Sequence, residues 1–370
     1  MNLEQRLRDP SLVRRRGFIG GVFVEAASGA SYSLRDPADD TPLGVVADMG
    51  AADTERAIDA AASALPAWRD LTAKQRGAFL ERWHDLQLEH VDDLAAIMTA
   101  EMGKPLAEAR GEVRYGASFV KWFAEEGKRA YGDIVPTFRA GARVLVLKQP
   151  IGVVGAITPW NFPSAMITRK CAPALAAGCT VVVKPAEATP LSALALAVLA
   201  DRAGIPAGVF NVIPCDRPNA PTVGSTLTAS PKVAKIGFTG STAVGKQLMR
   251  QAADTVKRVS LELGGNAPLI IFEDADLEAA VEGTLISKFR NTGQTCICAN
   301  RIFVQSRIYD RYAALLNQAV SGLRQGSGFE AGVALGPLVD DRAVAKVQDL
   351  VDDALASGAI AVCGGRISPL

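Results

Sequence analysis

Short apolar runs that alternate with helix-like segments constrain this sequence more than any other feature. Residues 153–158 and 180–184 are near-continuous runs of Val, Ile and small side chains, which is typical of strands buried on both faces. The helix-like segment 165–177 separates them. The same alternation continues in 192–203, 209–213, 235–239 and 243–253. The pattern predicts an α/β fold with a doubly wound parallel sheet covered by helices on both faces.

The flanking segments predict further elements. Residues 18–23, 32–36, 43–48 and 143–148 read as strands, and 52–64 and 73–89 as helices. Pro66 and Pro105 are expected to mark breaks between helices. After a domain boundary near Gly264-Gly265 we expect strands at 269–272, 301–304 and 359–362, and helices that begin at Leu277, Tyr309 and Arg342.

Composition narrows the class of protein. A length of 370 residues suggests two domains, and 40 Lys and Arg against 39 Asp and Glu give no basic excess for nucleic acid or an anionic membrane surface. Six scattered cysteines do not form a disulfide framework. The sequence has only two histidines, which argues against a His-based metal site and against a Ser-His-Asp triad. We expect a reducing, cytoplasmic compartment. Arg15-Arg16 resembles an export signal, but Glu25 interrupts the short apolar run that follows.

Polar or glycine-containing runs lie where the expected strands end, and ligands bind at the carboxyl ends of such strands. These runs are Thr158-Pro159-Trp160-Asn161-Phe162-Pro163, Lys184-Pro185-Ala186-Glu187, Phe238-Thr239-Gly240-Ser241-Thr242-Ala243-Val244-Gly245 and Leu261-Glu262-Leu263-Gly264-Gly265-Asn266. Gly240 and Gly245 bound a strand–turn–helix that can approach a pyrophosphate, or simply a tight turn. Lys184 and Glu187 can bind ribose hydroxyls or form a solvated ion pair. The charge of Glu187 would repel a 2′-phosphate, which favours NAD over NADP.

Three further side chains are candidates for catalysis. Cys296 lies among small polar residues, in Asn291-Thr292-Gly293-Gln294-Thr295-Cys296-Ile297-Cys298-Ala299-Asn300-Arg301, and is a reachable nucleophile or a packed structural thiol. Glu262, between two leucines, is expected to be partly desolvated and suited to act as a general base, unless neighbouring N–H groups satisfy it. Asn161 offers an amide N–H to an oxyanion, or forms a turn beside two prolines.

Five motifs in this order resemble the aldehyde dehydrogenase superfamily over nearly the whole chain. They are Pro159-Trp160-Asn161-Phe162-Pro163, Lys184-Pro185-Ala186-Glu187, Phe238-Thr239-Gly240-Ser241-Thr242, Leu261-Glu262-Leu263-Gly264-Gly265-Asn266 and Gly293-Gln294-Thr295-Cys296. Within the superfamily, Ile167-Thr168-Arg169-Lys170, Ser287-Lys288-Phe289-Arg290-Asn291 and 296–301 are similar to the NAD(P)-dependent succinate-semialdehyde dehydrogenases. A glutarate-semialdehyde or other aldehyde dehydrogenase is the alternative, because one methylene group is worth only about 1–3 kcal/mol.

The resemblance implies roles for these residues. Cys296 would attack the aldehyde, Asn161 would hold the oxyanion, and Glu262 would activate the water that hydrolyses the thioester. Arg169 and Arg290 would bind a carboxylate on the substrate, and Cys298 is a redox-switch candidate through a disulfide with Cys296. The cofactor cleft, for NAD with NADP possible, would be lined by Trp160, Lys184, Pro185, Ala186, Glu187, Gly240, Ser241, Thr242, Gly245 and Leu263.

The resemblance also implies the domain organisation. Residues 1–132 would form strands and helices that pack on the cofactor domain, and 133–150 the start of an oligomerisation hairpin. Residues 151–264 would form a Rossmann-like NAD-binding domain, and 265–370 an α/β catalytic domain. Full-length relatives would be homo-oligomers.

The end of the sequence departs from the family pattern. Ile367-Ser368-Pro369-Leu370 does not continue it, so we expect the catalytic domain to be incomplete at the C-terminus and apolar surface to be exposed around 300–365. The alternative to an active enzyme is then an inactive, truncated remnant that only binds NAD.

Overall fold

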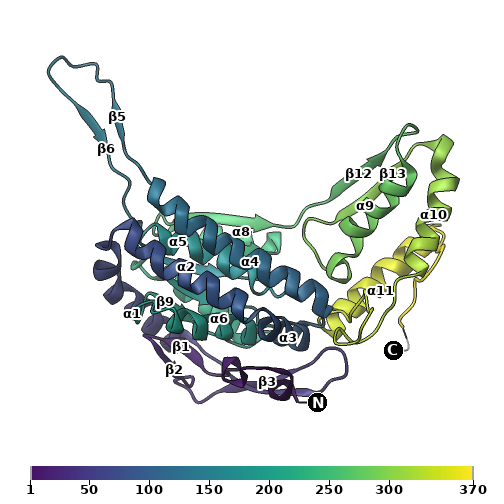
Figure 1. Cartoon of the computed structure of the whole chain (residues 1–370), viewed down its shortest axis with the longest axis horizontal. Coiled ribbons are helices and arrows are strands. Elements are labelled where there is room, and N and C mark those ends of the chain that lie inside the picture. Colours follow the sequence, from purple (N-terminus) through teal and green to yellow (C-terminus); the bar gives the residue numbers. More distant parts are fainter. Residues whose placement is uncertain (1, 369–370) are drawn as a thin grey trace.

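A seven-stranded sheet forms the centre of the larger of two lobes in the computed structural model, which describes residues 2–368 (Figure 1). Its strands lie in the order β11 (Arg258–Leu263), β10 (Val233–Gly240), β7 (Val153–Ile157), β8 (Thr180–Lys184), β9 (Phe210–Val212), β1 (Gly17–Ile19) and β2 (Val22–Val24). The strands from β7 to β11 are parallel, whereas β1 and β2 are antiparallel. The predicted doubly wound parallel sheet is confirmed.

The direction of the strand order reverses beside β7. Along the chain, β8 and β9 are added on one side of β7, and β10 and β11 on the other. The chain therefore leaves the carboxyl ends of β7 and β10 in opposite directions. An open α/β sheet forms a crevice at such a point. The polar runs that begin at Thr158 and Thr239 lie at this point.

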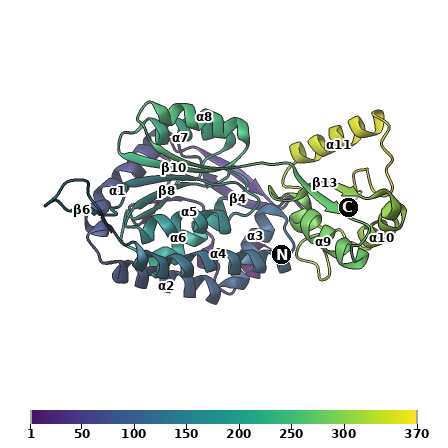
Figure 2. The ribbon, with the colours of Figure 1, turned by 90° about the horizontal axis from the view of Figure 1, so that it is seen from above.

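Helices cover both faces of the sheet (Figure 2). One face carries α1 (Ala51–Arg69), α7 (Ala220–Ala229) and α8 (Thr242–Ala253). The other carries α5 (Ala165–Ala176) and α6 (Pro190–Arg202), with α2 (Ala73–Glu89), α3 (Val91–Met102) and α4 (Leu106–Glu126) packed outside them. All residues of β7 and β8 are buried, as expected for strands between two helical layers.

Two antiparallel hairpins extend from the larger lobe. One pairs β3 (Ser31–Arg35) with β4 (Pro42–Ala47), and the other pairs β5 (Asp133–Val135) with β6 (Val144–Val146). The second hairpin projects away from the body and is exposed along both strands (Figure 1). Its role in oligomerisation stays a prediction, as do the domain bounds.

The smaller lobe contains a two-stranded parallel sheet. Its elements are β12 (Ala267–Ile271), α9 (Leu277–Phe289), β13 (Ala299–Val304), α10 (Tyr309–Ser321) and α11 (Asp341–Ala356). Apolar side chains are exposed here, including Phe303, Leu350 and Ile360. This confirms the expected exposed apolar surface between 300 and 365. Pro369 and Leu370, part of the terminal stretch singled out from the sequence, lie outside the described residues.

Three sequence expectations about local structure are wrong. The segment 18–23 is not one strand, because Gly20 and Gly21 take positive φ angles of 61° and 86° and turn the chain between β1 and β2. Pro66 lies inside α1, close to its C-terminal end, and the helix continues to Arg69 although the proline removes one i→i−4 hydrogen bond. Residues 359–362 are irregular, since no strand of the described chain pairs with them.

No helix within residues 2–368 is both long and apolar enough to cross a membrane.

The packing of the helical layer predicts a large effect of one substitution. Trp83 of α2 is fully buried, donates from Nε1 to Leu196 O at 3.1 Å, and meets the ring of Phe210 edge-on at 5.4 Å. Trp83→Ala is expected to lower the free energy of unfolding by about 3–5 kcal/mol through the cavity it leaves. Trp122→Ala is the control, because Trp122 is 64% exposed. Equal midpoints for both variants in urea unfolding would contradict this packing.

Candidate active site

Cys296 lies on an exposed loop between α9 and β13. The loop begins with a 3-10 turn, Arg290–Gly293, in which three successive residues are left-handed: φ is 54° at Asn291, 55° at Thr292 and 75° at Gly293. Such angles are unfavourable for side chains other than glycine, so surrounding contacts must hold the turn. Cys296 is exposed, which confirms that the thiol is reachable and rules out a packed structural thiol.

Asn161 joins the Cys296 loop to the carboxyl end of β7. Its Nδ2 donates to Gln294 O at 2.9 Å, and Asn291 Nδ2 donates to Asn161 O at 3.0 Å. An amide carries two N–H bonds, so one N–H of Asn161 remains for a ligand. The structure thus brings Asn161 and the loop of Cys296 together, from segments 133 residues apart.

Two buried charged residues that the sequence reasoning missed hold Asn161 in place. Lys104, between α3 and α4, pairs with Glu112 of α4, and both are 1% exposed. Lys104 Nζ also donates to Asn161 O at 2.9 Å, and Glu112 Oε1 accepts from the backbone N–H of Ser164 at 3.0 Å. The signal for this pair would have been an acidic residue among the apolar residues that α4 buries, beside Val113 and Ala109.

Glu262 is exposed, which corrects the expectation of a partly desolvated carboxylate. The reason is its position on β11, the edge strand, whose residues alternate between exposed and partly buried. In the strand register Glu262 lies beside Thr239 of β10, at the carboxyl edge of the sheet. An exposed carboxylate here is accessible to water and can accept a proton from it.

Lys170 of α5 is a second titratable group near this edge that the sequence reasoning did not assign a role. Burial lowers its pKa to about 8, while the charge of Glu262 acts in the opposite direction. A lysine with this pKa exchanges protons readily near neutral pH. Its place directly before the buried residues Cys171 and Ala172 was a signal in the sequence.

Glu187 forms an ion pair that the sequence did not reveal. Arg217 Nε lies 2.8 Å from Glu187 Oε1, and Arg217 NH2 lies 3.0 Å from Asp340 Oδ2 at the start of α11. Lys184 is buried, and its Nζ is 4.0 Å from Glu187 Oε2 and donates to Pro185 O at 3.0 Å. The predicted Lys184–Glu187 pair is therefore a longer contact than the pair with Arg217.

The remaining candidate cofactor residues surround the same edge of the sheet. Lys184, Pro185, Ala186 and Gly245 are buried, Trp160, Glu187, Gly240 and Leu263 are partly exposed, and Ser241 and Thr242 are exposed. At Gly245 an added Cβ would lie 2.7 Å from Leu263 Cδ2, so a larger residue would require the Leu263 side chain to move. The N-terminus of α8 lies at the carboxyl end of β10, where Ser241 Oγ accepts from the N–H of Val244, and a helix N-terminus favours an anionic group.

Two buried hydroxyls support a ligand in this crevice. Thr158 Oγ1 and Thr239 Oγ1, at the carboxyl ends of the adjacent strands β7 and β10, have no hydrogen-bond partner within the described chain. Buried polar atoms are normally paired, so the two hydroxyls fit a polar ligand bound at the switch point. Lys184 and Glu187, which can bind ribose hydroxyls, and the N-terminus of α8 lie at the same edge of the sheet. Together these groups fit a dinucleotide.

Arg169 and Arg290 are both exposed and both contact aromatic rings. The guanidinium carbon of Arg290 lies 5.0 Å from the centroid of Phe162, the residue after Asn161, and that of Arg169 lies 5.7 Å from Phe119 of α4. Stacking fixes the planes of both groups while leaving their N–H edges free to bind a carboxylate.

The cysteines differ sharply in accessibility. Cys298 is 1% exposed, and its Sγ lies 3.7 Å from both Lys288 O and Gly293 O. Burial raises the pKa of Cys215 to about 11, and that of Cys171 well above its usual range. All six thiols are free, and a Cys296–Cys298 disulfide stays a prediction. Within residues 2–368 no group of three or more His, Cys, Asp or Glu side chains could hold a metal ion.

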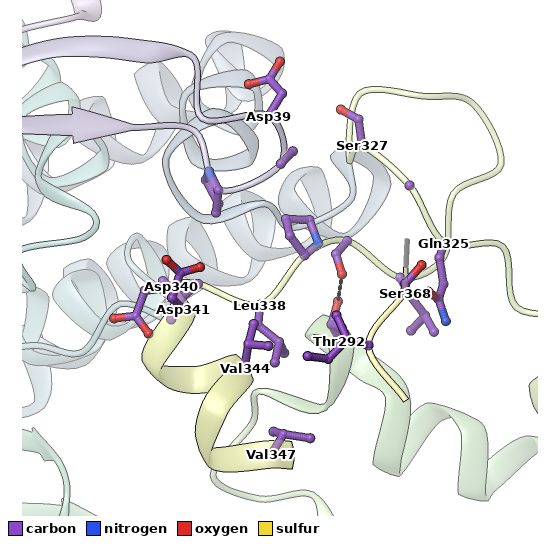
Figure 3. Close-up of a pocket in the computed structure, with 18 of the residues that line it drawn as sticks. Asp39, Thr292, Gln325, Ser327, Leu338, Asp340, Asp341, Val344, Val347 and Ser368 are labelled. Atoms are coloured by element: carbon purple, nitrogen blue, oxygen red, sulfur yellow. Dashed lines mark hydrogen bonds between the residues drawn. The ribbon is translucent and has the colours of Figure 1, made fainter. Parts of the chain in front are cut away.

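A cavity of about 1190 Å³ lies on another side of the Cys296 loop (Figure 3). It is lined by the turn after β3, by Thr292, by residues within 325–351 and by 365–368. Thr292 Oγ1 donates to Gly336 O at 3.3 Å at its margin. None of the candidate catalytic, cofactor or substrate residues lines it, so this cavity is not the candidate active site.

Comparisons with known proteins agree with this geometry. The model of the aldehyde dehydrogenase family matches residues 23–369. A succinate-semialdehyde dehydrogenase [NADP(+)] of Escherichia coli (strain K12) is 59% identical over 361 residues, which cover 98% of this chain and 74% of that protein. A glutarate-semialdehyde dehydrogenase of Pseudomonas aeruginosa is 57% identical over the same shares. The crystal structure of an NADP-dependent enzyme of E. coli superposes with a TM-score of 0.96 at 58% identity, over 98% of this chain and 75% of that one.

The chain therefore belongs to the aldehyde dehydrogenase family and is an NAD(P)-dependent oxidoreductase that acts on aldehydes.

Proposed function

We propose that the chain oxidises succinate semialdehyde to succinate with reduction of NAD(P), and that Cys296 is the nucleophile. The observation that carries the proposal is the exposed Cys296 on a loop fixed directly to Asn161. This arrangement supplies a thiol and an oxyanion donor from two segments that the fold holds together.

The residues then have separate tasks. The Cys296 thiolate adds to the aldehyde carbon, and the carbonyl oxygen takes the negative charge, which the free N–H of Asn161 stabilises. When bound, NAD(P) supplies the hydride acceptor that makes the reaction an oxidation and leaves a thioester on Cys296. Glu262 accepts a proton from water as the water oxygen attacks this thioester. The C–S bond breaks, the acid departs, and the thiolate is restored.

The substrate proposal rests on the two stacked arginines and on the relatives. Arg290 lies against Phe162, next to the oxyanion residue, so a carboxylate bound by it would lie close to the reacting aldehyde. The E. coli relative is named for succinate semialdehyde, and the P. aeruginosa relative for glutarate semialdehyde. Glutarate semialdehyde is therefore the second candidate substrate.

For the cofactor we propose a preference for NAD that is weaker than Glu187 alone would produce. The Glu187 carboxylate repels a 2′-phosphate, but Arg217 neutralises part of that charge at 2.8 Å. The E. coli relative is named as an NADP(+) enzyme, so use of both cofactors is expected.

Substitution of the nucleophile tests the mechanism. Cys296→Ala should lower kcat for NAD(P)H formation from succinate semialdehyde by at least about 10⁴-fold, because no other group can form the thioester. Cys363→Ala is the control, since Cys363 is the other exposed thiol. The measurement is absorbance at the NAD(P)H band together with mass spectrometry of the trapped acyl-enzyme. Turnover by folded Cys296→Ala close to that of the unmodified chain would refute the proposal.

The two arginines can be tested by comparing substrates. Arg290→Ala and Arg169→Ala should each raise KM for succinate semialdehyde roughly 10- to 100-fold, because a hydrogen bond to a charged group is worth about 1.5–3 kcal/mol. KM for butanal, which lacks the carboxylate, should change little. Arg250→Ala, at the end of α8, controls for loss of surface charge. Equal changes for both aldehydes would show that the arginines do not bind the carboxylate.

Two substitutions in one ion pair should shift cofactor preference in opposite directions. Glu187→Gln should raise kcat/KM for NADP relative to NAD on the order of tenfold, which corresponds to about 1.4 kcal/mol. Arg217→Ala should lower the same ratio, because it leaves the Glu187 charge unpaired. Glu273→Gln, an exposed acid of the smaller lobe, is the control. A shift of the same sign in both variants would contradict the role assigned to this pair.

A further inference from the structure

Two acidic residues one turn apart on α4 hold the two segments that form the oxyanion site. Glu108 Oε2 accepts from the backbone N–H of Asn291 at 2.7 Å, and Glu112 Oε1 accepts from the N–H groups of Ser164 and Ala165 at 3.0 and 3.2 Å. Residues four apart lie on the same face of a helix. One face of α4 therefore contacts both the Cys296 loop and the segment that follows Asn161.

Glu108 contacts the Cys296 loop at the residues whose backbone φ angles are unfavourable. Asn291 is fully buried and has φ of 54°, and Thr292 follows at 55°. Asn and Thr in this region are less stable than in a right-handed conformation, so the turn persists only where hydrogen bonds select it. Glu108 binds the first N–H of this turn, and Thr292 Oγ1 bonds to Gly336 O on the cavity side (Figure 3).

Asn291 passes this constraint on to Asn161 and to the approach to Cys296. Its Nδ2 donates to Asn161 O at 3.0 Å and to Gln294 O at 3.2 Å, and Asn161 Nδ2 donates to the same Gln294 O at 2.9 Å. Rotation of the Asn291 backbone would break these bonds together. The position of the oxyanion amide relative to the nucleophile therefore depends on the conformation that Glu108 selects.

The charges around Glu108 favour its acceptor role. Burial raises the pKa of Glu108, and the charge of Glu112 acts in the same direction. The Asn291 N–H and the charges of Lys104 and Arg290 lower it. A carboxylate with a backbone N–H partner and two cations nearby is a stronger acceptor than a neutral group.

We propose that Glu108 is a positioning residue for catalysis: it holds the left-handed turn at Asn291 and thereby sets the distance between Cys296 and the oxyanion amide of Asn161. This inference rests on the proposed roles of Cys296 and Asn161. Glu108 makes no hydrogen bond to Asn161, Cys296 or a candidate cofactor residue within the described chain, and its hydrogen bond goes to Asn291. Its charge also acts on Lys104 and Arg290, which is why the test includes Glu108→Gln and a direct readout of the turn.

The test compares substitutions that remove the acceptor or keep it. Glu108→Ala should lower kcat about 100-fold, the effect of a displacement on the order of 1 Å at a reacting group. KM for NAD(P) should not change, since the cofactor residues do not contact this turn. Glu108→Gln keeps an oxygen acceptor and should retain kcat within about tenfold, because a neutral acceptor gives a bond roughly half as strong. Deuterium uptake by the peptide that spans 290–298 should rise in Glu108→Ala and much less in Glu108→Gln.

A second substitution keeps the proposal testable if Glu108→Ala fails to fold. Asn291→Gly retains the N–H that Glu108 binds and tolerates the positive φ, but it removes the bridge to Asn161 O and Gln294 O. It should lower kcat with little change in melting temperature. Glu126→Ala, a partly exposed acid at the far end of α4, is the control for both variants.

The outcomes separate this proposal from the previous one. If turnover depends on Cys296 but Glu108→Ala and Asn291→Gly leave kcat unchanged, only the positioning role is overturned. If Cys296→Ala still turns over, the proposed mechanism itself fails. If Glu108→Ala and Glu108→Gln lose stability and kcat in parallel, with equal rises in deuterium uptake, Glu108 is a structural residue and the positioning role is rejected.

Discussion

The buried ion pair between Lys104 and Glu112 is the interaction on which the geometry of the site depends. Removing two charges from water is costly, and a pair such as this one is tolerated only when further hydrogen bonds satisfy both groups. Here Lys104 donates to Glu112 and to Asn161 O and lies 4.1 Å from the ring of Phe162, while Glu112 receives two backbone N–H groups. Apart from each other, all of these partners lie within 161–165, from the segment after β7 to the first residue of α5. The energy that keeps these charges buried is therefore also the energy that keeps Asn161 in place.

This arrangement explains why the helical layer matters for chemistry that occurs at the edge of a sheet. A doubly wound sheet brings loops together at its switch point, but it does not fix how those loops are oriented. Orientation comes from α4 on one side and from α11 on the other, where Asp340 binds Arg217. The second contact joins the start of α11 to the Glu187 carboxylate, so the nucleotide end of the crevice also depends on the smaller lobe.

The sequence predicted the structural features that depend on burial, but not those that depend on contacts between distant segments of the chain. Val and Ile runs predicted β7 and β8 correctly because strands between two helical layers must be apolar throughout. Glu262 was expected to be partly desolvated because leucines flank it, yet flanking residues on a strand point to the other face. The face that carries Glu262 is exposed because β11 is an edge strand. The local sequence pattern does not reveal the order of the strands in the sheet. Arg217 and Glu108 were missed for the same reason: their partners are 30 and 183 residues away. The resemblance to known motifs located Cys296 and Asn161, but not what holds them.

The connection between the lobes has a mechanical consequence. Gly264 and Gly265 follow β11 directly, and an added Cβ at either position would meet nothing within 4 Å. Neither residue has a side chain that packs against its surroundings, so packing at this link does not fix the spacing between Glu262 and Cys296. That spacing is set instead by contacts between the lobes, such as those of Asn291 with Glu108 and Asn161 and that of Asp340 with Arg217. The hydrogen bonds that join the lobes are therefore also what aligns the base with the nucleophile.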